Sequence, residues 1–242
     1  MVITSLENNR IKDLVKLQTK KYRDNTNTFL VEGYHLVEET YKSNILKEVF
    51  ALEGTSIDFD IPITYVSSEV MKKITTTDTY CDIVGLCEKK NSSEIIGNKI
   101  LLLDDIQDPG NLGTIIRSSV AFNVDTIVLS LNTVDLYNPK VLRSTQGLFC
   151  HINIINMDLV EAIDELKARN ITVYGTNVDG GKVVQDLELD GKYAIIVGNE
   201  GKGVRKEILD KCDEYFYIPM NSTCESLNVG VATSIILYEL NK

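Results

Sequence analysis

Polar residues that could do chemistry gather in three short segments of the second half of the chain. Residues 104–113 lead toward Arg117, residues 198–203 are rich in glycine, and residues 221–226 are mostly polar. Each segment follows a run of apolar residues typical of a strand. Because ligands bind beyond the carboxyl ends of strands in open α/β sheets, the three segments are candidates for one shared site.

The first segment places an amide and a guanidinium near each other in the sequence. Pro109-Gly110 favours a tight turn, and Asn111 could cap the helix that follows. Arg117 lies about two turns into that helix, where an arginine ordinarily forms a surface ion pair. In a ligand site the same side chain would be a fixed cation beside a phosphate.

The second segment, residues 198–203, permits close approach of a ligand to the backbone because three of its residues are glycine. It is not a P-loop, since Gly203 stands where Ser or Thr would follow Lys202. It is not a dinucleotide fingerprint either, since Lys206 occupies the place of the third glycine. Glu200 is either a plain turn residue or a partner for a hydroxyl or an arginine.

The third segment joins a predicted strand at residues 215–218 to a predicted helix at residues 227–240. Taken alone, Ser226 is an N-cap and Leu227 is a core residue. The free N–H groups of a helix N-terminus can instead meet a ligand. None of the three segments contains histidine, the commonest side chain for acid–base catalysis.

The elements that would position these segments alternate regularly from Lys99 onward. Asn138 before Pro139, and Asp158, are predicted N-caps. The alternation predicts a mostly parallel sheet covered on both faces. Strands are predicted at residues 100–103, 126–129, 152–155, 171–174, 193–197 and 215–218, and helices at residues 112–122, 139–148, 159–169, 204–209 and 227–240.

The first part of the chain also mixes strands and helices and predicts a small α/β domain. The polar stretch at residues 91–98 is the best candidate for a linker. We therefore expect domains at residues 1–97 and 98–242. Strands are predicted at residues 29–31, 46–52 and 63–66, and helices at residues 11–17, 32–43 and 70–74.

A net charge of −10 argues against a strongly basic nucleic-acid binder. Residues 10–23 are a local exception, with six cations and only one acidic residue, Asp13. Lys12, Lys16 and Lys20 recur at helical spacing and share one face. That face is either an ordinary solvated surface or a phosphate contact surface.

The apolar runs, cysteines and histidines of the sequence indicate where the protein is found and whether it binds a metal. No apolar run approaches the roughly 20 residues that span a bilayer, so no membrane association is expected. The five cysteines are scattered, no C-x-x-C occurs and only two histidines are present, so we expect no metal site and a reduced, cytoplasmic location.

Together the three segments resemble the three motifs of the SpoU/TrmH family of RNA ribose 2′-O-methyltransferases, part of the SPOUT superfamily. The residues that match are Asn111 with Arg117, then Gly198-Asn199-Glu200-Gly201-x-Gly203, then Ile218-Pro219-Met220 with Ser226-Leu227-Asn228-Val229. Ser222 departs from the family, in which glycine is common at this position. Residues 3–12 and 29–33 resemble the ribosomal-protein-L30-like RNA-binding domain of many members.

The resemblance implies a parallel α/β domain with a C-terminal deep trefoil knot, preceded by a small L30e-like α/β domain. It implies S-adenosyl-L-methionine as cofactor and a homodimer formed through the knotted domain. The cofactor contacts carried over by position are Gly198, Gly201, Ile218, Met220, Leu227, Thr176 and Asn177.

The resemblance also implies roles for the polar residues. Arg117 would activate the ribose hydroxyl, or orient an RNA phosphate while the proton leaves to water. Asn111 would position Arg117 or the ribose, and Glu200, Ser226 and Asn228 would complete the site. RNA contacts are expected at Arg10, Lys12, Lys16, Lys20, Arg23 and Arg143.

The predicted function is transfer of a methyl group to a ribose 2′-hydroxyl of RNA, with 23S rRNA favoured over tRNA because of the L30-like domain. Guanosine methylation in tRNA is one alternative. A non-catalytic RNA-binding or ribosome-assembly protein is another, and the presence of Asn111, Arg117, Glu200 and Ser226 argues against it.

Overall fold

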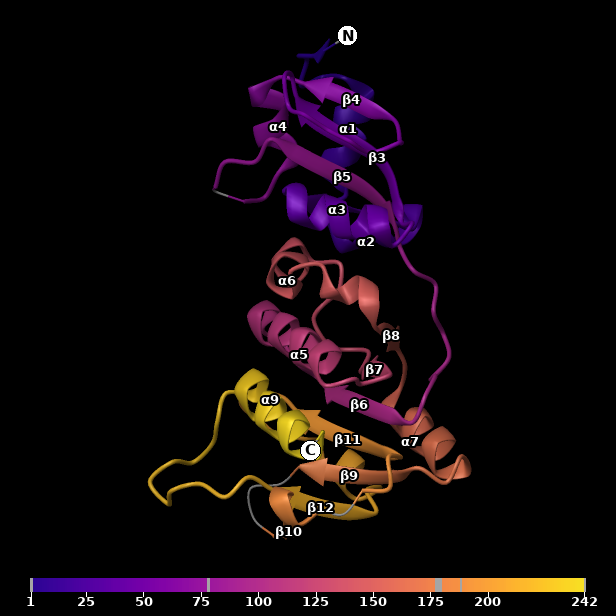
Figure 1. Cartoon of the computed structure of the whole chain (residues 1–242), viewed down its shortest axis with the longest axis vertical. Coiled ribbons are helices and arrows are strands. Elements are labelled where there is room, and N and C mark those ends of the chain that lie inside the picture. The colour runs from indigo at the N-terminus through magenta and orange to yellow at the C-terminus, as the bar shows by residue number, and fades with distance from the viewer. Residues whose placement is uncertain (1, 78, 177–179, 188, 242) are drawn as a thin grey trace. The chain divides into compact units, whose positions relative to one another are not determined.

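The computed structural model describes residues 2–77, 79–176, 180–187 and 189–241, which form two compact units (Figure 1). Unit 1 comprises Met1–Asn91 and Asp135–Cys150, and unit 2 comprises Ser92–Val134 and His151–Lys242. Among the described residues, no helix combines the length and apolarity required to cross a membrane.

Unit 1 is built on a five-stranded mixed sheet with the order β1-β4-β3-β5-β2. Its strands are β1 (Val2–Ile3), β2 (Thr28–Glu32), β3 (Leu46–Leu52), β4 (Ile63–Val66) and β5 (Ile83–Glu88). Its helices are α1 (Asn9–Lys16), α2 (Lys20–Thr26), α3 (Tyr34–Lys42), α4 (Ser68–Ile74) and α6 (Pro139–Thr145), followed by the 3-10 turn η1 (Leu148–His151).

The predicted elements of the first part of the chain are confirmed, and β1, α2 and β5 are additions. The apolar stripe of α1 packs as expected, since Ile11, Leu14 and Leu17 are buried against Phe50 and Met71. β5 was missed because its residues are buried on both sides and show little alternation.

Residues 135–150 cover β2, the edge strand of unit 1. The ring of Phe29 lies 4.5 Å from that of Tyr137 and 6.0 Å from that of Phe149. Arg23, almost fully buried, pairs with Asp135. The expected division at residues 97 and 98 follows sequence order and does not anticipate this arrangement, because the apolar face of an edge strand is covered here by a segment distant in sequence.

Unit 2 contains a seven-stranded, fully parallel sheet with the order β10-β12-β9-β11-β6-β7-β8 (Figure 1). This confirms the predicted parallel α/β sheet, to which the short strand β10 is an addition. The strands are β6 (Lys99–Asp104), β7 (Thr126–Leu129), β8 (Asn153–Asn156), β9 (Thr172–Thr176), β10 (Lys182–Val183), β11 (Tyr193–Gly198) and β12 (Glu214–Tyr217).

Helices cover both faces of this sheet. Ile100 and Leu102 pack against α7 (Leu159–Ala168), while Leu101 and Leu103 point to the opposite face and are equally buried. The remaining helices are α5 (Pro109–Ala121), α8 (Lys206–Leu209) and α9 (Val229–Leu240), and α5 packs against α9. The trefoil knot implied by the resemblance stays a prediction.

Candidate active site

The first and second polar segments meet through the carboxylate of Glu200. Its Oε1 accepts hydrogen bonds from the backbone N–H of Asp108 at 3.0 Å and from Asn111 Nδ2 at 3.0 Å. Its Oε2 accepts from the backbone N–H of Gln107 at 3.2 Å. One side chain of the glycine-rich segment therefore binds the start of α5.

The third segment joins the same network through Asn228. Its Nδ2 donates to Asn111 Oδ1 at 2.8 Å, while its Oδ1 accepts from the backbone N–H groups of Gly230 and Val231 at the start of α9. Glu200, Asn111 and Asn228 thus form one continuous chain of hydrogen bonds. The three segments come together as the order of motifs predicted.

Two residues that could by themselves have been helix caps, Asn111 and Ser226, do not cap a helix. Asp108, not Asn111, caps α5, because its Oδ1 accepts the N–H of Asn111 at 2.8 Å. Asn228, not Ser226, caps α9. The consequence is functional: the Asn111 side chain, freed from capping, is available to link Glu200 with Asn228. The predicted caps Asn138 and Asp158 are confirmed.

Glu200 is held as an anion by its neighbours. Burial raises the pKa of this carboxyl, but the hydrogen bonds from Asn111 and from the N–H groups of Asp108, Glu200 and Gln107 outweigh it and lower the pKa below its ordinary value. A carboxylate with a lowered pKa is a poor proton acceptor at neutral pH. Its geometry suits the fixing of loops.

Arg117 lies exposed on α5. Within the part of the chain that the structure describes, it forms no hydrogen bond and no ion pair. The expected contact with Asn111 is not made, since both polar atoms of the Asn111 amide are engaged elsewhere. The guanidinium is therefore open to a ligand.

A pocket of about 380 Å³ lies between the carboxyl ends of β11 and β12 and the start of α9. Six of the predicted cofactor contacts line it, and the seventh, Asn177, falls outside the described residues. Ser226, which lines the same pocket, is exposed. The lining residues that had been predicted are Thr176, Gly198, Gly201, Ile218, Met220 and Leu227.

The glycine-rich wall of this pocket has a fixed backbone. Asn199 and Gly203 exchange two backbone hydrogen bonds, of 3.0 and 2.9 Å. A Cβ placed on Gly198 would lie 2.1 Å from the backbone nitrogen of Val204, so no side chain fits there. Gly203 has a φ of +69°, which favours glycine.

Sequence reasoning missed two features that hold this wall, and the first is the role of the Asn199 side chain. The side chain of Asn199 accepts from the N–H of Gly201 and of Lys202 and donates to the carbonyl of Asp105 at 2.8 Å. An Asn two residues before a glycine is a known signal for such a turn.

The second missed feature is an ion pair that closes the far end of the glycine-rich segment. Asp104, fully buried at the end of β6, accepts from the backbone N of Arg205 at 2.7 Å and from its Nε at 2.8 Å. No local pattern signals this pair, since its members lie in different segments of the sequence.

The predicted RNA-contact residues are engaged with acidic partners. Arg23 is buried, and Arg143 pairs with Glu32, whose side chain is only 5% exposed. Each of these cations would have to leave its acidic partner to bind a phosphate. Their predicted contact with RNA stays a prediction. The remaining pairs are Arg10 with Glu48, Lys12 with Glu7, Lys16 with Asp13, and Lys20 with Asp24.

One group of side chains in the described part of the chain has the spacing of metal ligands: His35, Glu38 and Glu39 of α3. Lys42 Nζ lies 3.3 Å from Glu38 and 3.1 Å from Glu39, so an internal cation already neutralises both carboxylates. His35 Nε2 lies 3.1 Å from the carbonyl of Gln146. The grouping carries no functional assignment.

Comparison with protein families gives two matches along the chain. Residues 98–238 match the model of the SpoU rRNA methylase family, and residues 8–85 match that of the MRM3-like substrate binding domain. The chain is 42% identical to the 23S rRNA (guanosine(2553)-2′-O)-methyltransferase RlmP of Bacillus subtilis, over 98% of both chains.

Solved structures agree with these matches. The S-adenosylmethionine-bound rRNA methyltransferase of Sinorhizobium meliloti has a TM-score of 0.88 at 28% identity, over 99% of this chain and 96% of that one. The SpoU methyltransferase AviRb of Streptomyces viridochromogenes, at 21% identity, shares the fold with a TM-score of 0.88 over 97% of each chain.

Proposed function

The chain belongs to the SpoU rRNA methylase family, and from this premise we propose that it transfers a methyl group from S-adenosylmethionine to a ribose 2′-hydroxyl of 23S rRNA. The observation that carries the proposal is the hydrogen-bonded chain Glu200–Asn111–Asn228 beside the pocket. The target we propose is the guanosine equivalent to the one for which the Bacillus subtilis relative is named.

The pocket fits S-adenosylmethionine in size and in the character of its walls. Its volume of about 380 Å³ lies within the range of small-molecule sites. The bare backbone at Gly198 permits close approach, and Ile218, Met220 and Leu227 offer apolar surface. These residues would hold the cofactor, which supplies an activated methyl group when bound.

The residues of the chain then position the ribose. Asn111, Glu200 and Asn228 fix the start of α5 and the start of α9 relative to the glycine-rich segment. Arg117 is free to bind the phosphate next to the target ribose. Since arginine stays protonated in proteins, we assign it this orienting role, and the hydroxyl proton leaves to water as attack develops.

The proposed assembly is a homodimer through unit 2, acting in the cytoplasm. Its support in the structure is the exposed apolar surface of α9, on which Val231 is 48% and Tyr238 56% exposed. Sedimentation equilibrium tests the assembly: Val231→Ser with Tyr238→Ser should yield monomers, and an unchanged dimer contradicts the role given to this surface.

The central experiment is methyl transfer from labelled S-adenosylmethionine to purified ribosomal RNA and tRNA, followed by mapping of 2′-O-methyl positions. We expect one labelled guanosine in 23S rRNA. Labelling of tRNA alone would replace the proposed substrate with the alternative one. Binding of cofactor and RNA without any transfer would contradict the enzymatic function.

A further inference from the structure

The cations of unit 1 fall into two groups that differ in their partners. Those of α1 and α2 that had been expected to contact RNA all pair with carboxylates. Lys72 and Lys73 of α4, Lys140 of α6 and Lys21 of α2, which was not among the expected RNA contacts, are exposed and form no ion pair with any residue that the structure describes. A free lysine can bind a phosphate without first losing an internal partner.

The unpaired lysines of α4 and α6 border a loop that is firmly held. The buried carboxylate of Glu32 accepts hydrogen bonds from the N–H and Oγ1 of Thr76, at 2.8 and 2.7 Å, and from the N–H of Thr77 at 3.1 Å. Arg143 Nη1 donates to Glu32 at 3.1 Å and to Thr76 Oγ1 at 2.9 Å. The loop between α4 and β5 is thereby joined to α6.

These contacts connect the residues that follow α4 with α6, and α4 and α6 are the two helices that carry the lysines of interest. Lys73 lies three residues before Thr76, which Arg143 contacts, and Lys140 lies one helical turn before Arg143 on the same side of α6. The loop and α6 belong to the same compact unit. We name the set Lys72, Lys73, Tyr80 and Lys140 the α4–α6 surface.

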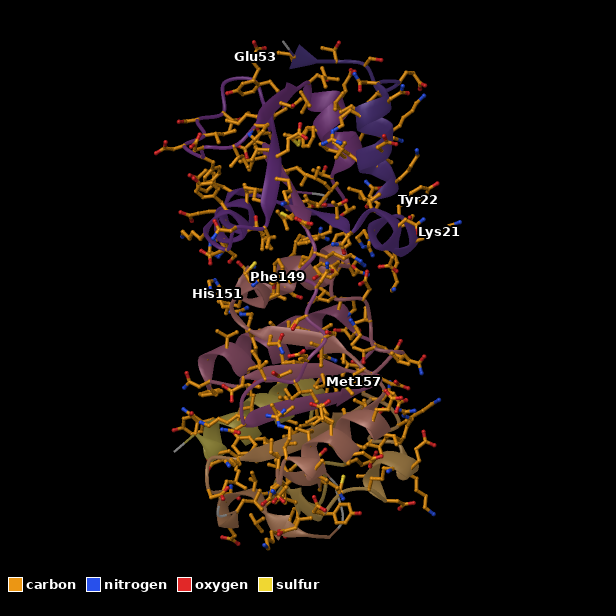
Figure 2. All side chains as sticks on the ribbon, turned by 90° about the vertical axis from the view of Figure 1, so that its right-hand side faces the viewer. Lys21, Tyr22, Glu53, Phe149, His151 and Met157 are labelled. Atoms are coloured by element: carbon orange, nitrogen blue, oxygen red, sulfur yellow. The ribbon has the colours of Figure 1, made fainter. Side chains whose placement is uncertain are left out.

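Tyr80, four residues after Thr76 in the sequence, is the aromatic residue that we include in this set. It is 85% exposed, the largest value among the exposed large apolar side chains of the described residues. An exposed aromatic ring beside free cations is the combination that binds unpaired bases, because the ring stacks on a base while the lysines bind the backbone. Tyr22 of α2, labelled in Figure 2, is less suited. It is 40% exposed, and Lys16 Nζ lies 5.7 Å from the centre of its ring.

We propose that the α4–α6 surface is where unit 1 binds an unpaired segment of the substrate RNA, with Tyr80 stacking on a base and Lys72, Lys73 and Lys140 contacting phosphates. This inference rests on the proposed function for the identity of the RNA. Arg143, expected from the sequence to contact RNA, is a positioning residue here, because Glu32 and Thr76 already bind its guanidinium.

Charge reversal in the full chain tests the surface. Lys73→Glu with Lys140→Glu should weaken binding of a 23S rRNA transcript at least about tenfold and should lower the slope of log K against log salt by about 0.7 per lost contact. The matched control is Lys12→Glu with Lys16→Glu on α1, which makes the same charge change and should weaken binding less than threefold. Affinity for S-adenosylmethionine should not change in either variant.

Stacking is tested separately by Tyr80→Ala against Tyr22→Ala, with the same transcript. Loss of one stacked base should weaken binding about 5- to 100-fold for Tyr80→Ala only. The proposal is overturned if the α1 control loses as much RNA affinity as the α4–α6 variant, or if neither loses any.

The outcome stays distinguishable from a failure of the proposed function. If the wild type binds RNA through Lys73 and Lys140 but transfers no methyl group, the surface stands and the enzymatic function falls. If the wild type methylates 23S rRNA and the reversal changes neither affinity nor transfer, the surface falls and the function stands.

Discussion

The polar residues of the two units are partnered in different ways. In unit 2, Glu200, Asn111 and Asn228 bind one another across three segments, and within the described part of the chain Arg117 is left without a partner. In unit 1, the cations of α1 and α2 that had been expected to contact RNA are neutralised pairwise by nearby acids. An exposed charge without an internal partner can bind a ligand, whereas a paired charge must first lose its partner. The presence or absence of such a partner therefore distinguishes a candidate binding surface from an ordinary solvated one.

One carboxylate in each unit is used in the same way, to hold a loop. Glu200 lies in the candidate active site, and its carboxylate oxygens accept hydrogen bonds from the protein itself, namely from Gln107, Asp108 and Asn111. Glu32 of unit 1 is used in the same way, holding the loop at Thr76 and Thr77. In both units a partnered anion orders a loop, and the cations that we propose for RNA contact are ones without a partner among the described residues.

The largest effect is expected from Arg117→Ala. If this guanidinium binds the phosphate next to the target ribose, its loss should lower kcat about 100- to 1,000-fold, the cost of removing one well-placed donor from an active site. Unit 2 should still fold and bind S-adenosylmethionine, because Arg117 is exposed and is not among the residues that line the pocket. Single-turnover methyl transfer and calorimetry measure the two effects.

Arg117→Lys sharpens this test. A lysine keeps the charge but loses the planar fork that binds a phosphate through two donors. Partial recovery would support an orienting role, and wild-type turnover in Arg117→Ala would remove Arg117 from the mechanism.

Much of unit 2 could be predicted because its signals are local. Apolar runs such as residues 126–129 need only their own sequence to be recognised, and Asn138 and Asp158 stand alone as caps in front of their helices. Asp108 and Asn111 compete for the same role three residues apart, so the sequence does not decide between them. The structure assigns the cap to Asp108 and the network to Asn111.

What escaped prediction depends on contacts between distant residues. Phe29 and Tyr137 are more than a hundred residues apart, and their packing is one of the contacts that place residues 135–150 in unit 1. The pairing of Asp104 with Arg205 has the same origin. The lysines of α1 and α2 show the opposite case. Their spacing was visible in the sequence, but the acids that neutralise Lys12 and Lys20 were not considered.

Glu200→Gln should have the next largest effect. It keeps the shape of the side chain and removes the charge that Asn111 and two backbone N–H groups bind, so we expect kcat to fall about 10- to 100-fold, roughly one or two charge-assisted hydrogen bonds. Glu200→Asp, which keeps the charge and shortens the reach, should be at least as damaging. Retained activity in the glutamine variant would show that the charge is dispensable.

The same residue gives a pH dependence with a defined sign. Because the pKa of Glu200 is lowered from 4.5, its contribution to the folded site is present above 4.5 and is lost as the pH falls through the lowered value. Affinity for S-adenosylmethionine in the wild type should therefore not depend on this group from pH 6 to 8. These pH values lie on the order of two units or more above the ordinary pKa of a glutamate. Loss of affinity at neutral pH in both wild type and Glu200→Gln would point to another group.

The smallest expected effect is on the free energy of unfolding, compared between one arginine variant in each unit. Arg205→Ala leaves the buried carboxylate of Asp104 with the backbone N–H of residue 205 as its remaining donor in the described structure. Arg143→Ala leaves Glu32 with three donors, from Thr76 and Thr77. An unsatisfied buried anion is costly, but both arginines are about one-third exposed and water screens the loss.

We therefore expect Arg205→Ala to lower the free energy of unfolding by about 2 kcal/mol and Arg143→Ala by about 1 kcal/mol. Urea titration followed by circular dichroism measures both, and Arg205→Lys is the control that restores a cation beside Asp104. Arg205→Ala should also weaken S-adenosylmethionine binding, because Arg205 closes the glycine-rich wall of the pocket, whereas Arg143→Ala should leave that binding unchanged. An equal loss of cofactor affinity in both variants would mean that the two units do not divide cofactor and RNA binding between them.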